Sequence, residues 1–196
     1  LDDGDYLIGA ALTDGKHDVM LFSDGGKAVR FDENDVRPLG RAARGVRGMM
    51  LEDGQSVIAM LVAEDETQSV LTATENGYGK RTSITEYTRH GRGTKGMIAI
   101  QQSERNGKVV AATLVHADDE IMLITDKGVL VRTRVSEIRE LGRATQGVTL
   151  IALDEGSKLS GLQRIVENDA NVTDAEADGD ASPDSGTSSA PEAPDA

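Results

Sequence analysis

The sequence predicts an all-β protein assembled from propeller-type blades. Three observations carry this prediction: a pattern that repeats every 51 residues, a β-hairpin signature in each repeat, and a composition with few aromatic residues. Aromatic residues make up 3% of the chain and Trp is absent, so the core must be built from Val, Ile, Leu, Met and Ala. Four short strands in each repeat of about 50 residues are typical of propeller blades.

Each repeat contains an apolar run, then Ser or Thr, an acid, a variable residue and Gly, and then a second run closed by Arg. These segments lie at 19–30, 70–81 and 121–132. Glycine takes a positive φ without steric cost, and the acid before it can accept hydrogen bonds from nearby backbone amides. The pattern therefore predicts three β-hairpins.

A short helical turn is expected after each hairpin. It is indicated by residues of N-cap type, followed by an acid and by apolar positions three residues apart. The expected N-caps are Asn34, Thr85 and Ser136. His90 occupies the apolar position that Leu39 and Leu141 hold in the other repeats, so we expect it to be half-buried.

A glycine-bounded loop, here called the box, follows each turn. Box 1 reads GRAARG at 40–45, box 2 GRGTKG at 91–96 and box 3 GRATQG at 142–147. Two glycines five residues apart suit a tight surface loop. We expect the glycines to fix the loop geometry, and they are Gly40, Gly45, Gly91, Gly96, Gly142 and Gly147.

The basic residues in and near the boxes are candidates for binding phosphate, because a purely structural loop gives no evident reason for Arg in second place in all three repeats. The box candidates are Arg41, Arg44, Arg47, Arg92, Lys95 and Arg143. Further candidates are the arginines that close the hairpins, Arg30, Arg81 and Arg132. For these three, an ion pair with an acid or a protective role on an edge strand is an equally consistent interpretation.

Two more strands are expected in each repeat. One follows each box, at 46–51, 97–100 and 148–153, and one opens each unit, at 7–12, 57–62 and 109–115. The blades then occupy 1–167, with units at about 7–56, 57–107 and 108–166, and 161–166 begins one more unit. Three blades do not close a ring, so we expect an incomplete arc, and the start at Leu1 suggests a fragment.

The net charge of −13 is unevenly distributed. Residues 167–196 hold nine acids and no Lys or Arg, and the remaining 25 acids against 21 bases give −4. Residues 37–48 hold four arginines and no acid. A local basic patch can bind phosphate on an acidic molecule because salt confines its field to about 8–10 Å. Residues 168–196 have almost no large apolar residue and are predicted to be a disordered acidic tail.

Several classes of site find no support in the sequence. Cysteine is absent, and no apolar run reaches the ~20 residues of a membrane helix. The three histidines, His17, His90 and His116, have no companion at metal-ligand spacing. No P-loop or Ser-His-Asp arrangement occurs. We therefore expect no catalytic residue, metal or cofactor in this segment.

The hairpin closed by Arg, the box Gly-Arg-x-x-(Arg/Lys/Gln)-Gly and the acidic tail resemble the family formed by the C-terminal domain of the DNA gyrase A subunit. The resemblance extends over about 7–166. It implies a β-pinwheel, a six-bladed relative of the propeller that bends double-stranded DNA around its rim. This chain then corresponds to the last three blades and the tail.

The resemblance also implies a parent that is a type II topoisomerase, an isomerase of the bacterial cytoplasm associated with the nucleoid. Its A and B subunits form an A2B2 heterotetramer that introduces negative supercoils, and the B subunit hydrolyses ATP with Mg²⁺. The family's hallmark box Q-R-R-G-G-K-G and the catalytic-tyrosine domain are not in this sequence, so neither supercoiling nor full wrapping is expected of it alone. The alternatives are the C-terminal domain of the topoisomerase IV A subunit or a propeller that binds an acidic protein.

Deletion of residues 168–196 should tighten DNA binding at low salt. The deleted segment carries eight acidic side chains, which compete with phosphate for the basic loops, and salt screens that competition. A mobility-shift titration of the whole chain and the truncated chain on one random-sequence duplex measures this effect. Equal affinities at low salt would reject the prediction.

Overall fold

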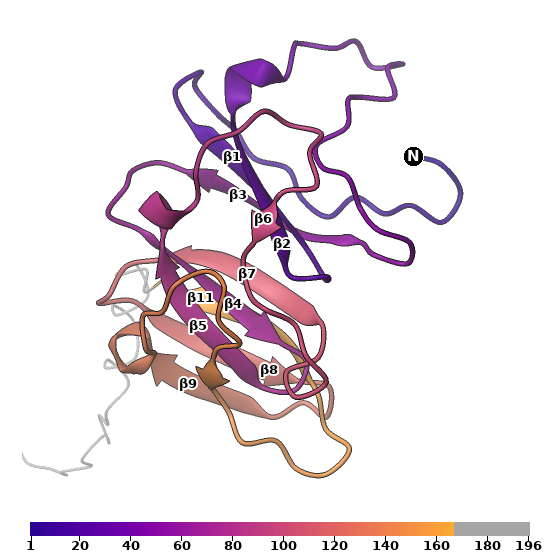
Figure 1. The fold of residues 1–196 in the computed structure, drawn as a ribbon. Helices are drawn as coiled ribbons and strands as arrows, with labels where there is room; N and C mark the ends of the chain where they lie inside the picture. Colours follow the sequence, from indigo (N-terminus) through magenta and orange to yellow (C-terminus); the bar gives the residue numbers. More distant parts are fainter. Residues whose placement is uncertain (167–196) are drawn as a thin grey trace, which may run out of the picture. The chain divides into compact units, whose positions relative to one another are not determined.

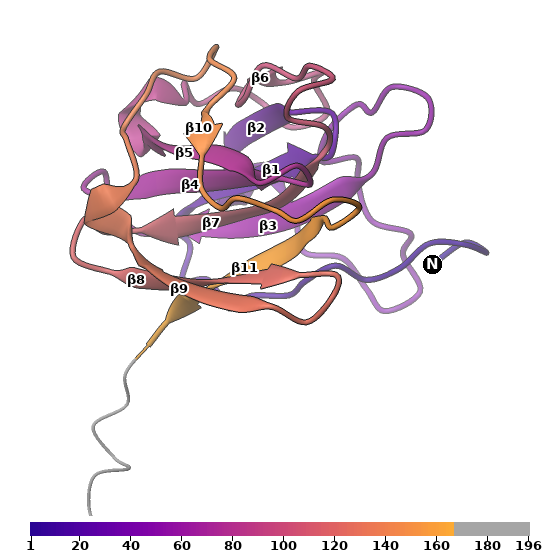
Figure 2. The ribbon, with the colours of Figure 1, turned by 90° about the horizontal axis from the view of Figure 1, so that it is seen from below.

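The structure, a computed structural model, describes residues 1–166, and within them eleven strands form three antiparallel sheets (Figures 1 and 2). The first sheet has the order β3 (Val57–Ala63), β1 (Asp18–Ser23), β2 (Lys27–Asp32) and β6 (Met97–Ile98). The second has β10 (Val148–Thr149), β5 (Tyr78–Ser83), β4 (Ser69–Thr74) and β7 (Val109–Val115). The third has β11 (Leu159–Ile165), β8 (Glu120–Thr125) and β9 (Leu130–Arg134). The predicted all-β class is confirmed, and the predicted acidic tail at 168–196 lies outside the described residues.

The three hairpins lie where the sequence predicts them, as the pairs β1–β2, β4–β5 and β8–β9. At the first turn, Gly26 has a φ of 77°. A Cβ on this glycine would lie 2.5 Å from the carbonyl oxygen of Ile100. Glycine is therefore required both for the turn and for the close approach of the segment that follows box 2.

Each sheet combines strands from successive expected units. β3 was expected to open the second unit, and it pairs with β1 of the first hairpin. β6, which follows box 2, pairs with β2 of the same hairpin. In the same way β7 and β10 join the second hairpin. The third sheet has three of the four expected strands among residues 1–166, because no further box follows to supply a strand to β9.

Two predicted strands do not form. Residues 7–12 are exposed and have no strand pairing, because a strand of this type pairs with the hairpin before it and no hairpin precedes residue 7 among the described residues. Residues 46–51 contain a single bridge, from Met49 to Thr94. The strands expected at 97–100 and 148–153 each shorten to two residues, whereas the last predicted strand is confirmed as β11.

The short turns after the hairpins are confirmed as 3-10 turns at Glu33–Asp35, Ile84–Glu86 and Val135–Glu137. Their N-caps are Asp32, Ser83 and Arg134, two residues before the predicted ones. The side chain of Asp32 accepts a hydrogen bond from the Asn34 N–H at 2.9 Å. Each helix is one turn long and begins directly at the strand end, so the cap is the last strand residue.

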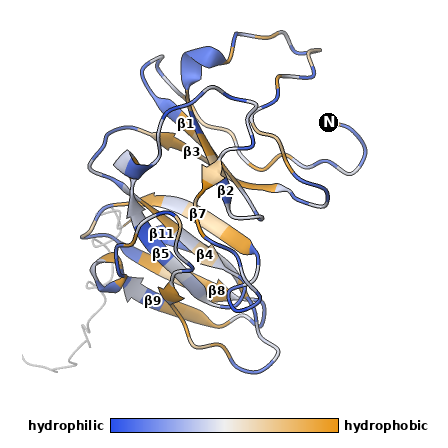
Figure 3. Ribbon diagram, viewed as in Figure 1, coloured by the Kyte–Doolittle hydropathy of each residue, from blue (hydrophilic) through white to orange (hydrophobic). Residues whose placement is uncertain are grey.

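The second sheet is buried on both faces because it lies between the other two. Adjacent residues of a strand point to opposite faces. Val70 of β4 packs in a cluster with Phe22 and Tyr87, whose rings meet edge to face at 6.1 Å, whereas Leu71 packs with Ile121. Figure 3 shows β3, β7 and β8 mostly in the hydrophobic colours and the turn after β2 as hydrophilic. No helix among residues 1–166 has the length and apolar character needed to span a membrane.

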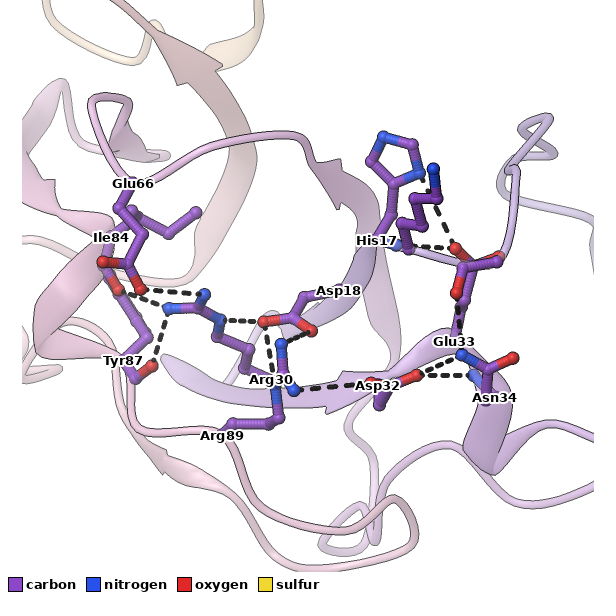
Figure 4. Close-up of polar contacts among 12 residues, drawn as sticks. His17, Asp18, Arg30, Asp32, Glu33, Asn34, Glu66, Ile84, Tyr87 and Arg89 are labelled. Atoms are coloured by element: carbon purple, nitrogen blue, oxygen red, sulfur yellow. Dashed lines mark hydrogen bonds and ion pairs between the residues drawn. The ribbon is translucent and has the colours of Figure 1, made fainter.

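A buried ion-pair network joins the first sheet to the turn of the second repeat (Figure 4). Asp18 is 3% exposed, and its Oδ2 accepts a hydrogen bond from Arg30 Nε at 2.7 Å. Arg89 Nη2 lies 2.7 Å from Asp18 Oδ1. Arg30 Nη1 also donates to the carbonyl oxygens of Ile84 and Tyr87, at 3.0 and 3.1 Å. One carboxylate therefore holds two arginines that belong to successive repeats.

The second sheet also contains a buried lysine, Lys80. Val29 and Val131 hold the equivalent positions in the other repeats. Its ammonium donates to the carbonyl oxygens of Gly142 and Arg143 in box 3. The pKa of Lys80 is lowered to about 8, chiefly by burial, with smaller opposing effects from the charge of Glu86, which raises it, and of Arg143, which lowers it.

Replacing Asp18 by Asn should destabilise the chain by about 3 kcal/mol, because the change leaves the buried Arg30 with the exposed Glu66, 3.9 Å away, as its remaining counter-charge. Urea unfolding of the wild-type and variant chains measures the difference. Asp32→Asn is the matched control, because it removes an exposed partner of Arg89 while Asn still caps the turn, and it should cost less than about 1 kcal/mol. Equal losses for the two variants would contradict a central role for Asp18.

Stability should rise with pH above about 8 in the wild-type chain and less steeply in Lys80→Met. The folded-state pKa of Lys80 is about 8 and its ordinary pKa is 10.5, so the folded state releases this proton first. The unfolded state then binds more protons between these values, and the free energy of unfolding increases with pH. The gain over the variant should be on the order of 2 kcal/mol between pH 8 and 9.5. Parallel pH profiles would contradict a buried, protonated Lys80.

Candidate nucleic-acid interface

The boxes of successive repeats lie side by side and are joined by backbone hydrogen bonds. The segment after box 1 contacts box 2, where the Met50 N–H donates to the carbonyl of Thr94 at 2.8 Å. The segment after box 2 contacts box 3 in the same way, with the Gln101 N–H 2.9 Å from the carbonyl oxygen of Thr145. The three boxes therefore form one row, here called the rim, made of residues 37–51, 89–102 and 139–149.

The second glycine of boxes 2 and 3 lies directly against a hairpin strand, whereas Gly45 of box 1 has no atom within 4 Å of its Cβ position. Gly45, Gly96 and Gly147 have φ values of 85°, 73° and 80°. A Cβ on Gly96 would lie 2.3 Å from the carbonyl oxygen of Ala28. The first glycine of each box does not adopt a positive φ, so the prediction that both glycines are needed for backbone conformation holds for the second alone.

The second-place arginines of boxes 2 and 3 point into the protein and bind backbone carbonyls of the preceding repeat. Arg92 donates from Nε to the carbonyl of Asp35 at 2.9 Å and from Nη1 to that of Arg47 at 3.1 Å. Arg143 donates from Nη1 to the carbonyl of Ile98 at 2.9 Å. Both side chains are half-buried. These contacts give a structural reason for the recurring arginine, which the sequence reasoning lacked.

Two hairpin arginines are also engaged inside the protein. Arg30 is 9% exposed and binds Asp18 and the carbonyls of the next repeat. Arg81, 51 residues later, donates from Nε to the carbonyl of Ile138 at 2.8 Å. The carbonyl of Tyr87 is the equivalent acceptor for Arg30. Of the interpretations that the sequence left open, the structure has the ion pair at Arg30 and, at Arg81, an ion pair with Glu140 at 4.0 Å beside the backbone contact.

Arg132, the third hairpin arginine, pairs with Glu120 of the neighbouring strand. Half of its side chain is exposed. Arg30 and Arg81 each bind carbonyls of the repeat that follows their own. Among residues 1–166, no such repeat follows Arg132. Arg132 therefore lies at the surface but its charge is shared with a carboxylate.

The remaining cations of the first two boxes face solvent. Arg41, Arg44, Arg47 and Lys95 are exposed, as is Arg37 before box 1. Arg44 lies 3.7 Å from Asp2, but both side chains are more than two-thirds exposed, so the pair contributes little. The other four make no ion pair within the described part of the chain. Five cations are therefore available to a ligand on this stretch of the rim.

Arg47 and Lys95 meet at the junction of boxes 1 and 2. They line one shallow hollow of about 430 Å³ with Met49, Met50 and Leu51. The pair comes from successive repeats and is brought together by the bonds between Met50 and box 2. Two unpaired cations in one open hollow can attract an anion.

Box 3 differs because its fifth place is Gln146. Box 1 has Arg44 and box 2 has Lys95 at this position. The Gln146 side chain accepts a hydrogen bond from Ser103 Oγ at 3.3 Å, and the Gln146 backbone carbonyl accepts one from Asn106 Nδ2 at 3.1 Å. Of the cations near box 3, Arg143 is turned inward and Arg139 is exposed. The free positive charge of the rim thus decreases from the first box to the third.

Other candidate chemistry is sparse in the described residues. His90 is exposed, not half-buried as predicted, and lines a hollow with Lys95 and Thr94 on box 2. Asp14, His17 and Glu33 are the group whose ligand atoms lie close enough for a metal ion, with His17 Nδ1 2.9 Å from Asp14 Oδ1. The same distance suits an ion pair between imidazolium and carboxylate. Hydrogen bonds from Thr13 and from the His17 backbone lower the pKa of Glu33.

Comparison with known proteins gives consistent results. The family model "DNA gyrase C-terminal domain, beta-propeller" matches residues 17–64, 68–116 and 119–165. Each match begins one residue before a hairpin and ends at, or one residue after, the strand that follows it, β3, β7 or β11. The DNA gyrase A subunit of Pseudomonas aeruginosa is 54% identical over 167 residues, which is 85% of this chain and 18% of that protein. The chain thus spans about a fifth of this relative's length.

Two solved structures share the fold. The C-terminal domain of DNA topoisomerase IV superposes with a TM-score of 0.80 at 25% identity, covering 84% of this chain and 51% of that one. The DNA gyrase A C-terminal domain superposes with a TM-score of 0.78 at 29% identity, covering 84% and 56%. Both superpositions confirm the predicted β-pinwheel. With the family model matching its three repeats, this chain belongs to the DNA gyrase C-terminal domain family.

Proposed function

We propose that this chain binds double-stranded DNA along the rim and bends it without reading its sequence. The single observation that carries this proposal is the row of exposed, unpaired cations on adjoining boxes, above all Arg47 and Lys95 in one hollow. Arginine and lysine bind phosphate oxygens, which are the same at every base pair. A row of such cations on successive repeats suits successive phosphates of one duplex.

The contacts are proposed to be concentrated on the first two boxes. Five outward cations lie there: Arg37, Arg41, Arg44, Arg47 and Lys95. Bending 20–30 base pairs costs of order 1–6 kcal/mol, so several of these contacts must act together. Box 3 adds Arg139 as its exposed cation, which supports a weaker contact at that end.

The charge of the whole chain does not oppose this proposal. The net charge is −13, but salt screens charges that lie further than about 8–10 Å apart. The stretch 37–48 holds four arginines without an acid, so its local field is positive. DNA that meets this stretch is attracted even though the molecule as a whole is acidic.

We further propose that DNA bending by this chain supports negative supercoiling by a gyrase holoenzyme. The relatives are bacterial DNA gyrase A subunits, of which the chain spans about a fifth. Strand cleavage then belongs to the rest of that protein, and ATP hydrolysis with Mg²⁺ to its B-type partner. The sequence holds no P-loop for a nucleotide. Gyrase is favoured because sequence relatives of 54% and 53% identity are DNA gyrase A subunits, and because the superposed gyrase domain is 29% identical against 25% for the topoisomerase IV domain.

The salt dependence of binding tests the proposal. The logarithm of the affinity should fall by about 0.9 per phosphate contact for each unit of log salt, so five contacts predict a slope of about −4 to −5. A filter-binding series on a random-sequence duplex measures this slope. A flat response would instead favour a propeller that binds proteins.

Substituting the fifth residue of box 2 should remove one phosphate contact, and the reverse substitution in box 3 should add one. Lys95→Gln should reduce the magnitude of the salt slope by about 0.9, and Gln146→Lys should increase it by about as much. The two substitutions are reciprocal and neither residue is buried, so both chains should fold as the wild type. Unchanged slopes in both variants would contradict the assignment of the fifth place to DNA contact.

A further inference from the structure

We infer that Arg92 and Arg143 are positioning residues that set the spacing between successive DNA-contacting loops and hence the bend of the bound duplex. This inference rests on the proposed binding of DNA to the rim. The inference assigns different roles to two positions of the box. The residue in second place fixes its loop to the preceding repeat, and the residue in fifth place faces the DNA. The geometry of box 2 shows both on one loop.

Arg92 binds two separate points of the preceding repeat. Its Nε donates to the carbonyl of Asp35, at the end of the 3-10 turn, and its Nη1 to the carbonyl of Arg47, after box 1. A guanidinium is planar, so two donors directed at two carbonyls fix the orientation of the loop as well as its distance. These two contacts add to the backbone hydrogen bond from Met50 to Thr94, and together they hold box 2 against rotation relative to box 1.

A similar set of contacts between a box and the preceding repeat, here called a joint, is found between boxes 2 and 3. Arg143 donates to the carbonyl of Ile98, which is 45 residues before it, as Arg47 is before Arg92. The backbone N–H of Arg143 also donates to Oε2 of Glu86 at 3.1 Å, and Glu86 ends its 3-10 turn as Asp35 ends the preceding one. Each joint therefore links a box to the turn region and to the post-box segment of the preceding repeat.

The joint lies next to the proposed DNA contacts. The backbone of Arg47 receives Arg92 while its own side chain faces solvent, and Lys95 follows Arg92 by three residues. A change in the joint therefore moves Lys95 relative to Arg47 without removing either charge. Loosely joined loops can follow a straighter duplex with the same phosphates in contact, whereas fixed loops impose their own outline on the DNA.

The test measures bend and contact number separately in this chain. Energy transfer between dyes at the two ends of a short duplex reports the bend of the saturated complex, and the salt slope reports the number of phosphate contacts. With one of two joints removed, Arg92→Met should lose roughly half of the wild-type change in transfer efficiency while the salt slope stays the same.

Arg44→Met is the matched control, because it removes the same charge from box 1 where the side chain is 89% exposed and binds no carbonyl. It should lower the magnitude of the salt slope by about 0.9 and lose less of the bend of the saturated complex than Arg92→Met does. Arg92→Lys keeps the charge but cannot direct two fixed donors, so it should lose bend as Arg92→Met does. Because Arg92→Lys is the milder change, it serves as the test variant if Arg92→Met fails to fold.

Wild-type bend in Arg92→Lys, or a slope loss in Arg92→Met equal to that of Arg44→Met, would overturn the inference. A wild-type chain that binds DNA without bending it would overturn it as well. These outcomes differ from failure of the proposed function, in which the wild-type chain shows no salt-dependent binding at all.

Discussion

The rest of this structure depends on hydrogen bonds from arginine side chains to backbone carbonyls of a neighbouring repeat. Arg30 and Arg81 reach forward to the turn of the next repeat, and Arg92 and Arg143 reach back to the preceding one. A charged donor makes a stronger hydrogen bond than a neutral one, and an arginine presents several in a rigid plane. The contacts thus join sheets whose apolar faces alone would allow sliding.

The sharing of strands between repeats and the arginine contacts act together at each interface between successive repeats. A hairpin receives two strands from the next repeat, so neither repeat completes a sheet by itself. Aliphatic residues such as Val70 and Leu71 then pack on opposite faces of the second sheet. The arginines lie at the margins of these apolar clusters, where they also satisfy carbonyls that no strand partner reaches. The boxes are thereby held in a row with the remaining cations facing outward.

The hairpins, the 3-10 turns and the last strand could be predicted from the sequence, because each depends on local patterns of apolar residues, glycine and capping residues. The pairing of Val57–Ala63 with the preceding hairpin could not, because period and composition are the same whichever hairpin a strand joins. The candidate site was predicted in part. Arg44, Arg47 and Lys95 are exposed as expected, whereas Arg30, Arg92 and Arg143 bind inside the protein. Sequence spacing shows that an arginine recurs but not which way it points.

Side-chain NMR of the arginine Nε–H groups, recorded during a DNA titration, tests the central claim most directly. The account predicts slowly exchanging Nε–H signals for Arg30, Arg81 and Arg92, whose Nε atoms donate inside the protein, and little change in them as DNA is added. It predicts fast-exchanging signals for Arg41, Arg44 and Arg47 that shift with DNA. Fast exchange of the first group together with large shifts on binding would contradict the account.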